Sequence, residues 1–278
     1  MSIIALAGPG ALGWGAADFL GGKATRKAPT ITVVMLSQLV SAPALAVFVA
    51  ATATAGPRPL DLALGAAAGG FGLLGMVLLY RTLATAGAAI VAPVSAVVTA
   101  LVPLITGLFL QTVPGPMALT GACCAVASIA LVSRVTGANG SVFAARTLSY
   151  SLIAGGALGL QLVFLTLPGP PADLWPLVGA RTCSILFASL IMFRARGRSA
   201  GSGLRMPLIA LIGLLDTAAF VFYLYATAHG LLSVVGPIVS LYPASTVALA
   251  MIIDRERVGA LQSLGLGFAA TSLVLTTL

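Results

Sequence analysis

The sequence predicts an all-α integral membrane protein of ten transmembrane helices, arranged as two inverted five-helix repeats. Hydrophobic residues make up 59% of the 278 residues and charged residues only 7%, whereas a soluble domain carries about 25% charged residues. The apolar residues form stretches of the length that a helix needs to cross a bilayer, about 20 residues. An odd number of such stretches in each half would invert the second half relative to the first.

Ten apolar stretches follow one another along the chain. The breaks between them are short and rich in turn residues, as in Gly-Pro-Arg-Pro at 56–59 and Pro-Gly-Pro-Pro at 168–171, and they leave no room for a soluble domain. The stretches lack the alternation of barrel strands and are about twice as long. We therefore expect membrane-spanning helices at residues 3–22, 31–55, 61–81, 87–110, 115–133, 147–167, 174–193, 206–228, 231–253 and 258–277.

The two halves of the chain align without a gap at a shift of 144 residues. The shift places Gly69 on Gly213 and Pro93 on Pro237. Inverted repeats are typical of secondary transporters, whose substrates bind near the bilayer midplane between the repeats. We expect a first five-helix repeat at 1–135, a linker at 136–146 and a second five-helix repeat at 147–278.

Basic residues lie almost entirely in every second connection. Twelve Lys and Arg residues lie in or beside the connections that follow spans 1, 3, 5, 7 and 9, and only Arg58 lies in the others. Cytoplasmic connections carry the Lys and Arg excess in membrane proteins. We therefore expect a multi-pass protein of the cytoplasmic (inner or plasma) membrane with both termini outside. The net charge of +8 belongs to these connections, so we expect no nucleic acid partner.

A segment near the N-terminus, Gly8-Pro-Gly10-Ala-Leu-Gly13, matches the G-x-G-x-x-G dinucleotide fingerprint. Such a site also needs a βαβ unit and an acidic residue about 20 positions later, and no acidic residue lies between Asp18 and Asp61. We therefore interpret these glycines as small surfaces for close helix packing. The three cysteines lack metal-ligand spacing, and the single His has no nucleophile near it in sequence. We expect no enzyme activity, cofactor or metal site.

Two charged residues lie near the middle of predicted spans, where an ionisable group costs at least about 2.5–3.5 kcal/mol on insertion scales. Asp216 shares a helical face with Phe220 and Tyr223, and Arg181 lies at a similar depth in the preceding span. Asp216 could bind a substrate amine or carry a coupling proton, because apolar surroundings favour the neutral form of a carboxyl group. It could instead form an intramembrane ion pair with Arg181. Arg181 could also bind a substrate carboxylate or tie helices together.

A third acidic residue, Asp18, lies about one turn before the end of the first span. Trp14 precedes it by four residues on the same helical face. A tryptophan and an aspartate that face a cavity could recognise a cation or an aromatic ring. Lys23 is five residues further on, so Asp18 could instead reach water at the interface and pair loosely with this lysine.

Further polar residues within the spans are candidate substrate contacts, and two prolines are candidate hinges. Each proline removes one backbone hydrogen bond and frees a carbonyl, which is tolerated at membrane depth where it lines a cavity. Pro93 and Pro237 are therefore either ordinary kinks or gating positions. The expected substrate-binding residues are Trp14, Asp18, Ser95, Gln161, Asp216, Phe220, Tyr223, Ser240 and Tyr242.

Three stretches resemble EamA-type members of the drug/metabolite transporter superfamily. They are GWGAADFLGGKATRK, LYRTLATAGAAIVAPVSAVVTALVP and HGLLSVVGPIVSLYPASTVALAMIIDRERVGALQSLG. The resemblance covers essentially the whole chain and implies a central cavity lined by spans 1, 3, 4, 6, 8 and 9. The family often has Gly-Glu-Arg after spans 4 and 9; here those positions read Gln-Thr-Val at 111–113 and Arg-Glu-Arg at 255–257. Ten-span relatives usually have cytoplasmic termini, opposite to the orientation that the basic residues predict.

These observations predict a secondary active transporter, an exporter of a small metabolite such as an amino acid or a drug-like compound, that works by alternating access. Its partners would be the small-molecule substrate and the lipid bilayer, and the oligomeric state stays open, a monomer included. One alternative is a non-transporting membrane scaffold. The other is a membrane-embedded enzyme, which six scattered acidic residues and one His disfavour.

Overall fold

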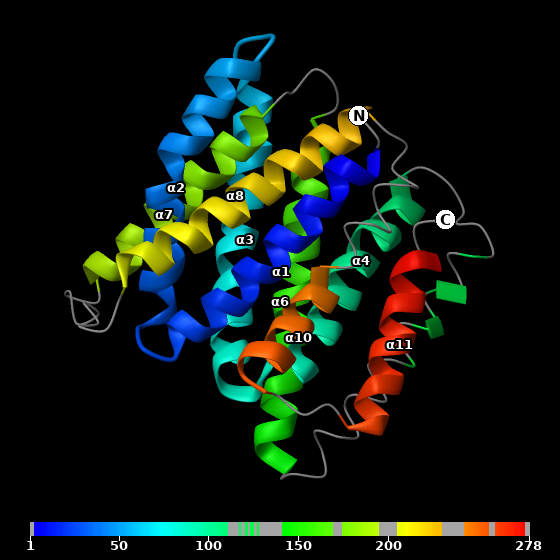
Figure 1. The fold of residues 1–278 in the computed structure, drawn as a ribbon. Coiled ribbons are helices and arrows are strands. Elements are labelled where there is room, and N and C mark those ends of the chain that lie inside the picture. Colours follow the sequence, from blue (N-terminus) through cyan, green and yellow to red (C-terminus); the bar gives the residue numbers. More distant parts are fainter. Residues whose placement is uncertain are drawn as a thin grey trace.

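The computed structural model describes residues 3–110, 141–168, 174–194, 205–229, 242–255 and 259–275, with single positions at 117, 120, 121, 123, 124 and 127. Every regular element in this part of the chain is an α-helix, as the composition predicts (Figure 1). The helices are α1 (Ile3–Thr25), α2 (Thr30–Thr52), α3 (Pro59–Ala86), α4 (Ala88–Leu110), α6 (Ser141–Thr166), α7 (Trp175–Arg194), α8 (Met206–His229), α10 (Tyr242–Ile253) and α11 (Ala260–Leu275).

Eight of the ten predicted spans each coincide with one of these helices. The predicted span at 115–133 lies mostly outside the described residues, and so does the first part of the span at 231–253. Five helices of the described part are long and apolar enough to cross a membrane by length and composition. These stretches are Thr30–Thr52, Pro59–Ala86, Ala145–Thr166, Trp175–Arg194 and Met206–Ala226.

The third helix is longer than the sequence predicts. The expected span ends at residue 81, but α3 continues to Ala86 and α4 begins at Ala88. Gly87 between them has a φ of 83°, a left-handed conformation that glycine adopts without steric cost. The helix therefore continues past Arg81 and ends where Gly87 adopts this conformation. At its other end, Pro59 begins α3, where the missing N–H has no helical partner to lose.

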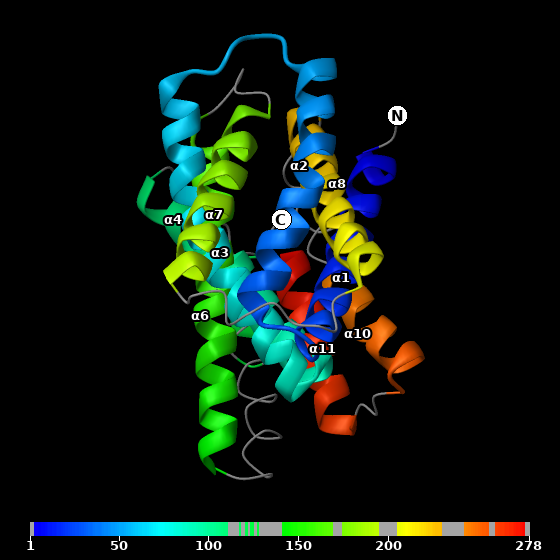
Figure 2. The ribbon, with the colours of Figure 1, turned by 90° about the vertical axis from the view of Figure 1, so that its left-hand side faces the viewer.

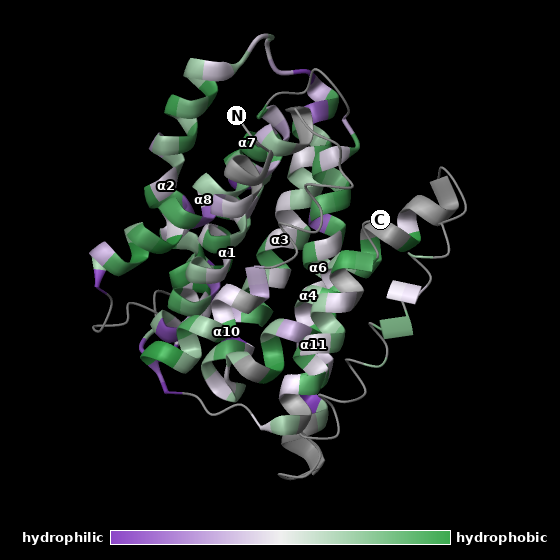
Figure 3. Ribbon diagram, turned by 45° about the vertical axis from the view of Figure 1, so that its right-hand side comes forward, coloured by the Kyte–Doolittle hydropathy of each residue, from purple (hydrophilic) through white to green (hydrophobic). Residues whose placement is uncertain are grey.

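The distribution of side chains is that of a membrane protein. Large hydrophobic side chains point outward on most helices, with Phe193 84% and Ile252 75% exposed. Polar residues such as Gln38, Ser95 and Thr246 are buried. Figure 3 shows hydrophobic residues along the length of the helices and hydrophilic residues mainly near helix ends and connections. The outer surface therefore suits lipid, and the polar groups lie inside the bundle.

Helices of the two halves pack against each other in matched pairs (Figures 1 and 2). The 144-residue shift takes α1 to α6, α2 to α7, α3 to α8 and α4 to the region of α10. Accordingly, α1 packs on α8 and α6 packs on α3, while α2 packs on α8 and α7 packs on α3. The contact of α1 with α10 likewise corresponds to that of α6 with α4. This pairing fits an architecture of two repeats.

Repeat-related glycines lie at two of these crossings. A Cβ added at Gly69 of α3 would overlap the backbone of Ala180 in α7, and one added at Gly213 of α8 would overlap the backbone of Ser37 in α2. Small residues allow helix backbones to approach closely where no water drives association. The glycines that the sequence aligns thus form equivalent close contacts in the two halves. Ser184 adds a hydrogen bond from its hydroxyl to the Gly69 carbonyl at 2.7 Å.

Candidate functional site

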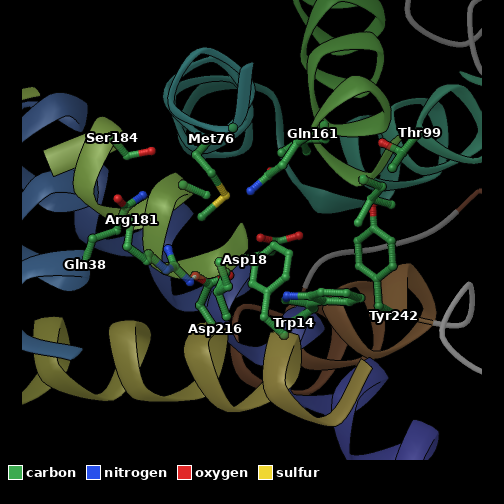
Figure 4. A pocket seen from close by; sticks show the side chains of 16 residues that line it. Trp14, Asp18, Gln38, Met76, Thr99, Gln161, Arg181, Ser184, Asp216 and Tyr242 are labelled. Atoms are coloured by element: carbon green, nitrogen blue, oxygen red, sulfur yellow. Dashed lines mark hydrogen bonds and ion pairs between the residues drawn. The ribbon is translucent and has the colours of Figure 1, made fainter. Parts of the chain in front are cut away.

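A cavity of about 60 Å³ lies at the centre of the bundle, where helices of both halves meet (Figure 4). We refer to it as the central cavity. It has room for a few water molecules or a small ligand. The residues that line it come from α1, α2, α3, α4, α6, α7, α8 and α10: Trp14, Asp18, Gln38, Gly72, Met76, Thr99, Leu158, Gln161, Leu162, Leu177, Ala180, Arg181, Ser184, Asp216, Phe220 and Tyr242.

An ion pair joins two helices at the wall of the central cavity. Arg181 of α7 donates from Nη2 to the Oδ2 oxygen of Asp216 in α8, and each side chain is 8% exposed. The guanidinium also lies over the ring of Phe220, 5.3 Å from its centroid. The ion pair that the sequence left as one alternative is therefore present. It brings together two charges that would each be expensive alone in an apolar environment.

A second carboxylate in the central cavity has no such partner. Asp18 is 8% exposed, and no described residue donates a hydrogen bond to it or forms an ion pair with it. Lys23 pairs with Asp254 at the end of α10 instead, and Arg26 reaches the same carboxylate at 3.3 Å. The loose pairing of Asp18 with Lys23, which the sequence also allowed, is thus not formed. Figure 4 shows Asp18 between Asp216 and Trp14.

An aromatic cluster surrounds Trp14 beside these charges. The ring of Trp14 lies 4.9 Å from that of Phe220 in an edge-to-face arrangement, and 5.6 Å from that of Tyr223. Tyr242 from α10 lies 6.2 Å away, also edge to face. Such pairs hold aromatic rings in fixed orientations. Trp14 is therefore packed into the wall of the cavity by three aromatic neighbours.

Several polar residues that the sequence did not single out also line the central cavity. Gln38 lies beside Ser37, the residue that the repeat aligns with Arg181, and its Oε1 has no partner among the described residues. Thr99 donates to the carbonyls of Ser95 at 2.8 Å and Gly155 at 3.1 Å. Thr99 lies one helical turn after Ser95, which the sequence marked as a candidate. Both Gln38 and Thr99 could have been identified from the sequence as polar side chains near the middle of an apolar span.

Some expected site residues lie elsewhere. Ser95 is buried and donates back to the carbonyls of Val91 and Ala92 within α4. The ring of Tyr223 packs on that of Trp14, and Pro93 is buried in α4. Neither these two nor Ser95 is among the described residues that line the cavity. Ser240 and Pro237 lie outside the described residues.

The lining of the central cavity repeats with the 144-residue shift. The shift takes Trp14 to Leu158 and Asp18 to Leu162, and all four residues line the cavity. It also takes Gly72 to Asp216 and Met76 to Phe220, which line it as well. Equivalent positions of the two halves therefore face one space. Only one member of each pair is charged or carries a large aromatic ring, so the cavity is chemically asymmetric.

A mainly apolar cavity that holds buried charged groups between two similar halves is typical of a secondary transporter. The sequence model of the EamA-like transporter family matches residues 1–134 and again residues 146–278. The chain therefore belongs to the EamA-like transporter family, within the drug/metabolite transporter superfamily, as the sequence motifs predict. No curated protein matches the chain at a significant level. Membership of a transporter family is consistent with a protein that is not an enzyme.

Proposed function

We propose that the protein is a secondary active transporter that exports a small metabolite across the cytoplasmic membrane by alternating access. The observation that carries the proposal is the meeting of Asp18, Arg181 and Asp216 in one cavity between the two halves. Ionisable residues within spans are rare and typically mark substrate or ion pathways. The family provides the transporter class, and the cavity provides the place where a substrate would bind.

Alternating access requires that the two ends of the cavity open in turn. At one end of the bundle lie ion pairs weak enough to break and re-form during each cycle. Lys23 and Arg26 at the end of α1 pair with Asp254 after α10. We propose that this ionic cluster, which we call the α1–α10 clamp, closes the pathway at the end that carries most basic residues. Exposed or half-exposed ion pairs are weak, about 0–1 kcal/mol, so such a clamp could open and close during each cycle.

Proton coupling through Asp216 is part of the proposal. If the carboxyl accepts a proton, its ion pair with Arg181 is weakened, and this link between α7 and α8 would be loosened. Vesicles containing the protein should then accumulate substrate when a pH gradient is imposed. The Asp216→Asn variant should lose this gradient-driven accumulation, and Asp216→Glu should keep part of it. Unchanged gradient-driven transport in Asp216→Asn would exclude the coupling role.

The transport function itself is tested with purified protein in sealed vesicles. A panel of labelled amino acids, amines, carboxylates and drug-like compounds is screened for exchange, with protein-free vesicles as the control. We expect exchange of at least one class, and its loss when Trp14→Ala removes the aromatic wall. Failure to exchange any compound would favour the scaffold alternative. In a scaffold, replacing Arg181 and Asp216 together by apolar residues should leave function intact.

A further inference from the structure

We propose that the central cavity binds organic monocations, with Asp18 as the counter-ion and Trp14 as the aromatic surface on which the cation lies. The inference rests on the proposed transport function and names the charge class of its substrate. It begins with the charge balance of the cavity. Among the described residues that line it, Asp18, Asp216 and Arg181 carry carboxylate or guanidinium groups. Since Arg181 neutralises Asp216, the cavity keeps one negative charge when Asp18 is ionised.

The position of Asp18 makes this remaining charge a binding group. The residue is more than nine-tenths buried, it lines the cavity, and none of the described residues pairs with it. A buried carboxylate without a partner is unfavourable, whereas a cation in the cavity would neutralise it. The basic residue nearest in sequence, Lys23, is held by Asp254. A cation from outside the described chain would neutralise the ionised carboxylate in place of a proton.

The aromatic residues next to Asp18 suit the same ligand. Trp14 lies one helical turn before Asp18, so both side chains face the cavity from α1. Tryptophan has the strongest attraction for cations among the aromatic side chains. Arg181 already lies over the ring of Phe220, while no described Lys or Arg lies over Trp14. The apolar lining residues Met76, Leu158 and Leu162 would contact the hydrocarbon part of the cation.

The arrangement of Arg181 argues against a zwitterion or an anion. Its guanidinium is bound to Asp216 and packed on Phe220, and its Nε is fully enclosed with no partner among the described residues. A substrate carboxylate would have to displace Asp216, and the cavity would then hold three carboxylates and one guanidinium. A bound monocation makes the sum of these charges zero, a zwitterion leaves it negative, and an anion makes it more negative.

The experiment uses three ligands with the same aromatic body. Phenethylamine is a cation, phenylalanine a zwitterion and phenylacetate an anion at neutral pH. The chain has two tryptophans, so the Trp175→Phe variant leaves Trp14 as the only tryptophan and its fluorescence reports ligand in the cavity. Trp175 lies away from the cavity and donates from Nε1 to the Ala55 carbonyl at 2.8 Å. The full chain is purified in detergent, titrated with each ligand, and then tested for exchange of the same ligands in vesicles.

We expect phenethylamine to bind at least about tenfold more tightly than the other two ligands. In the same background, Asp18→Asn should weaken phenethylamine binding at least about tenfold and Asp18→Glu should retain most of it, with thermal unfolding as the check on folding. Equal binding of phenylalanine, or unchanged binding in Asp18→Asn, would overturn the inference. If Asp18→Asn does not fold, the comparison of the three ligands on the protein with Asp18 unchanged tests the inference by itself.

The outcome also separates this inference from the transport function. Exchange of phenylalanine or phenylacetate without exchange of phenethylamine would leave a transporter with a different substrate charge, and the cation inference would be wrong. Binding of none of the three ligands would also overturn the cation inference, whereas the wider compound panel would still test transport.

Discussion

Single residues decide how charge is accommodated inside this protein. Arg181 lies on α7 and Asp216 on α8, and both are buried. Removing one member of a buried ion pair leaves the other charge without compensation, whereas replacing both by apolar residues is often neutral or stabilising. The pair is therefore not expected to stabilise the fold beyond what hydrophobic residues would provide. Its presence at the cavity wall instead favours a role in function.

This argument predicts the effect of substitutions at the pair. Asp216→Leu alone should lower the free energy of unfolding by about 3–5 kcal/mol, because the Arg181 guanidinium then lies buried and unpaired. The double variant Arg181→Met with Asp216→Leu should recover most of this loss while transport stays absent. Thermal unfolding in detergent measures the first effect, and vesicle exchange the second. A double variant as unstable as the single one would show that the pair itself stabilises the fold.

At the scale of helices, close approach at glycines decides which elements pack together. Gly69 meets the backbone of Ala180 in α7, whereas the adjacent Gly70 has open space where a Cβ would lie. The two residues have the same helix propensity and nearly the same depth. The two glycines are therefore a matched pair for mutation, because the crossing of α3 and α7 requires a glycine only at Gly69.

Replacing each glycine by alanine in turn distinguishes the effect of helix packing on stability from the effect of helix propensity. Gly69→Ala should destabilise the protein by about 1–3 kcal/mol, the usual effect of overpacking, because the α3–α7 crossing must widen. Gly70→Ala should leave stability unchanged or raise it by about 0.5–1 kcal/mol, since alanine favours the helix. Thermal unfolding of both variants gives the comparison. Equal melting temperatures would mean that α3 and α7 adjust freely at this crossing.

The α1–α10 clamp gives a second prediction for the elements. Asp254→Asn removes the acceptor of Lys23 and Arg26, so the ends of α1 and α10 should separate more often while overall stability hardly changes. Ala250 on α10 is buried, and a cysteine placed there in a variant without other cysteines reports the separation. A membrane-impermeant maleimide should label it several-fold faster in Asp254→Asn.

A charge reversal provides the control for this measurement. Lys23→Asp combined with Asp254→Lys restores one ion pair and should return labelling toward its original rate. Identical labelling rates in the original protein and in Asp254→Asn would mean that the clamp does not control access at that end of the bundle.

For the whole molecule, side-chain contacts join connections that the basic residues assign to the same side. Lys23 and Asp254 join the connections after spans 1 and 9. Arg58, after span 2, donates to the carbonyl of Pro168, after span 6, at 3.2 Å. When successive helices run in opposite directions, odd-numbered connections lie at one end of the bundle and even-numbered connections at the other. It agrees with the division of the connections into two sets, one of which holds twelve basic residues.

The orientation in the membrane follows as a prediction. Because cytoplasmic connections carry the basic residues, an epitope tag added at either end of the chain should be accessible from outside intact cells. Accessibility to an impermeant antibody or protease measures this. Tags that become accessible only after the cells are opened would give the orientation that the family resemblance implies, and the charge bias would then not decide topology.

Much of the architecture could be predicted from the sequence because it depends on composition and local pattern. Long apolar stretches with few charges can only be satisfied as helices in a membrane, and eight predicted spans coincide with helices. The end of α3 does not follow from the apolar length of the span, because the backbone conformation of Gly87 ends the helix. Trp14, Asp18, Gln161 and Asp216 could be marked as site candidates because polar residues are rare within spans.

The sequence by itself determined the class of protein, the positions of most helices and the few polar residues within them. Only the tertiary structure decided the partners of those residues: Arg181 pairs with Asp216, Lys23 with Asp254, and Asp18 with no described residue. The physical reason is that a partner on another helix depends on how the two helices are rotated and shifted relative to each other. Close contacts such as that of Gly69 with Ala180 fix this arrangement, and a pattern along one chain does not contain it.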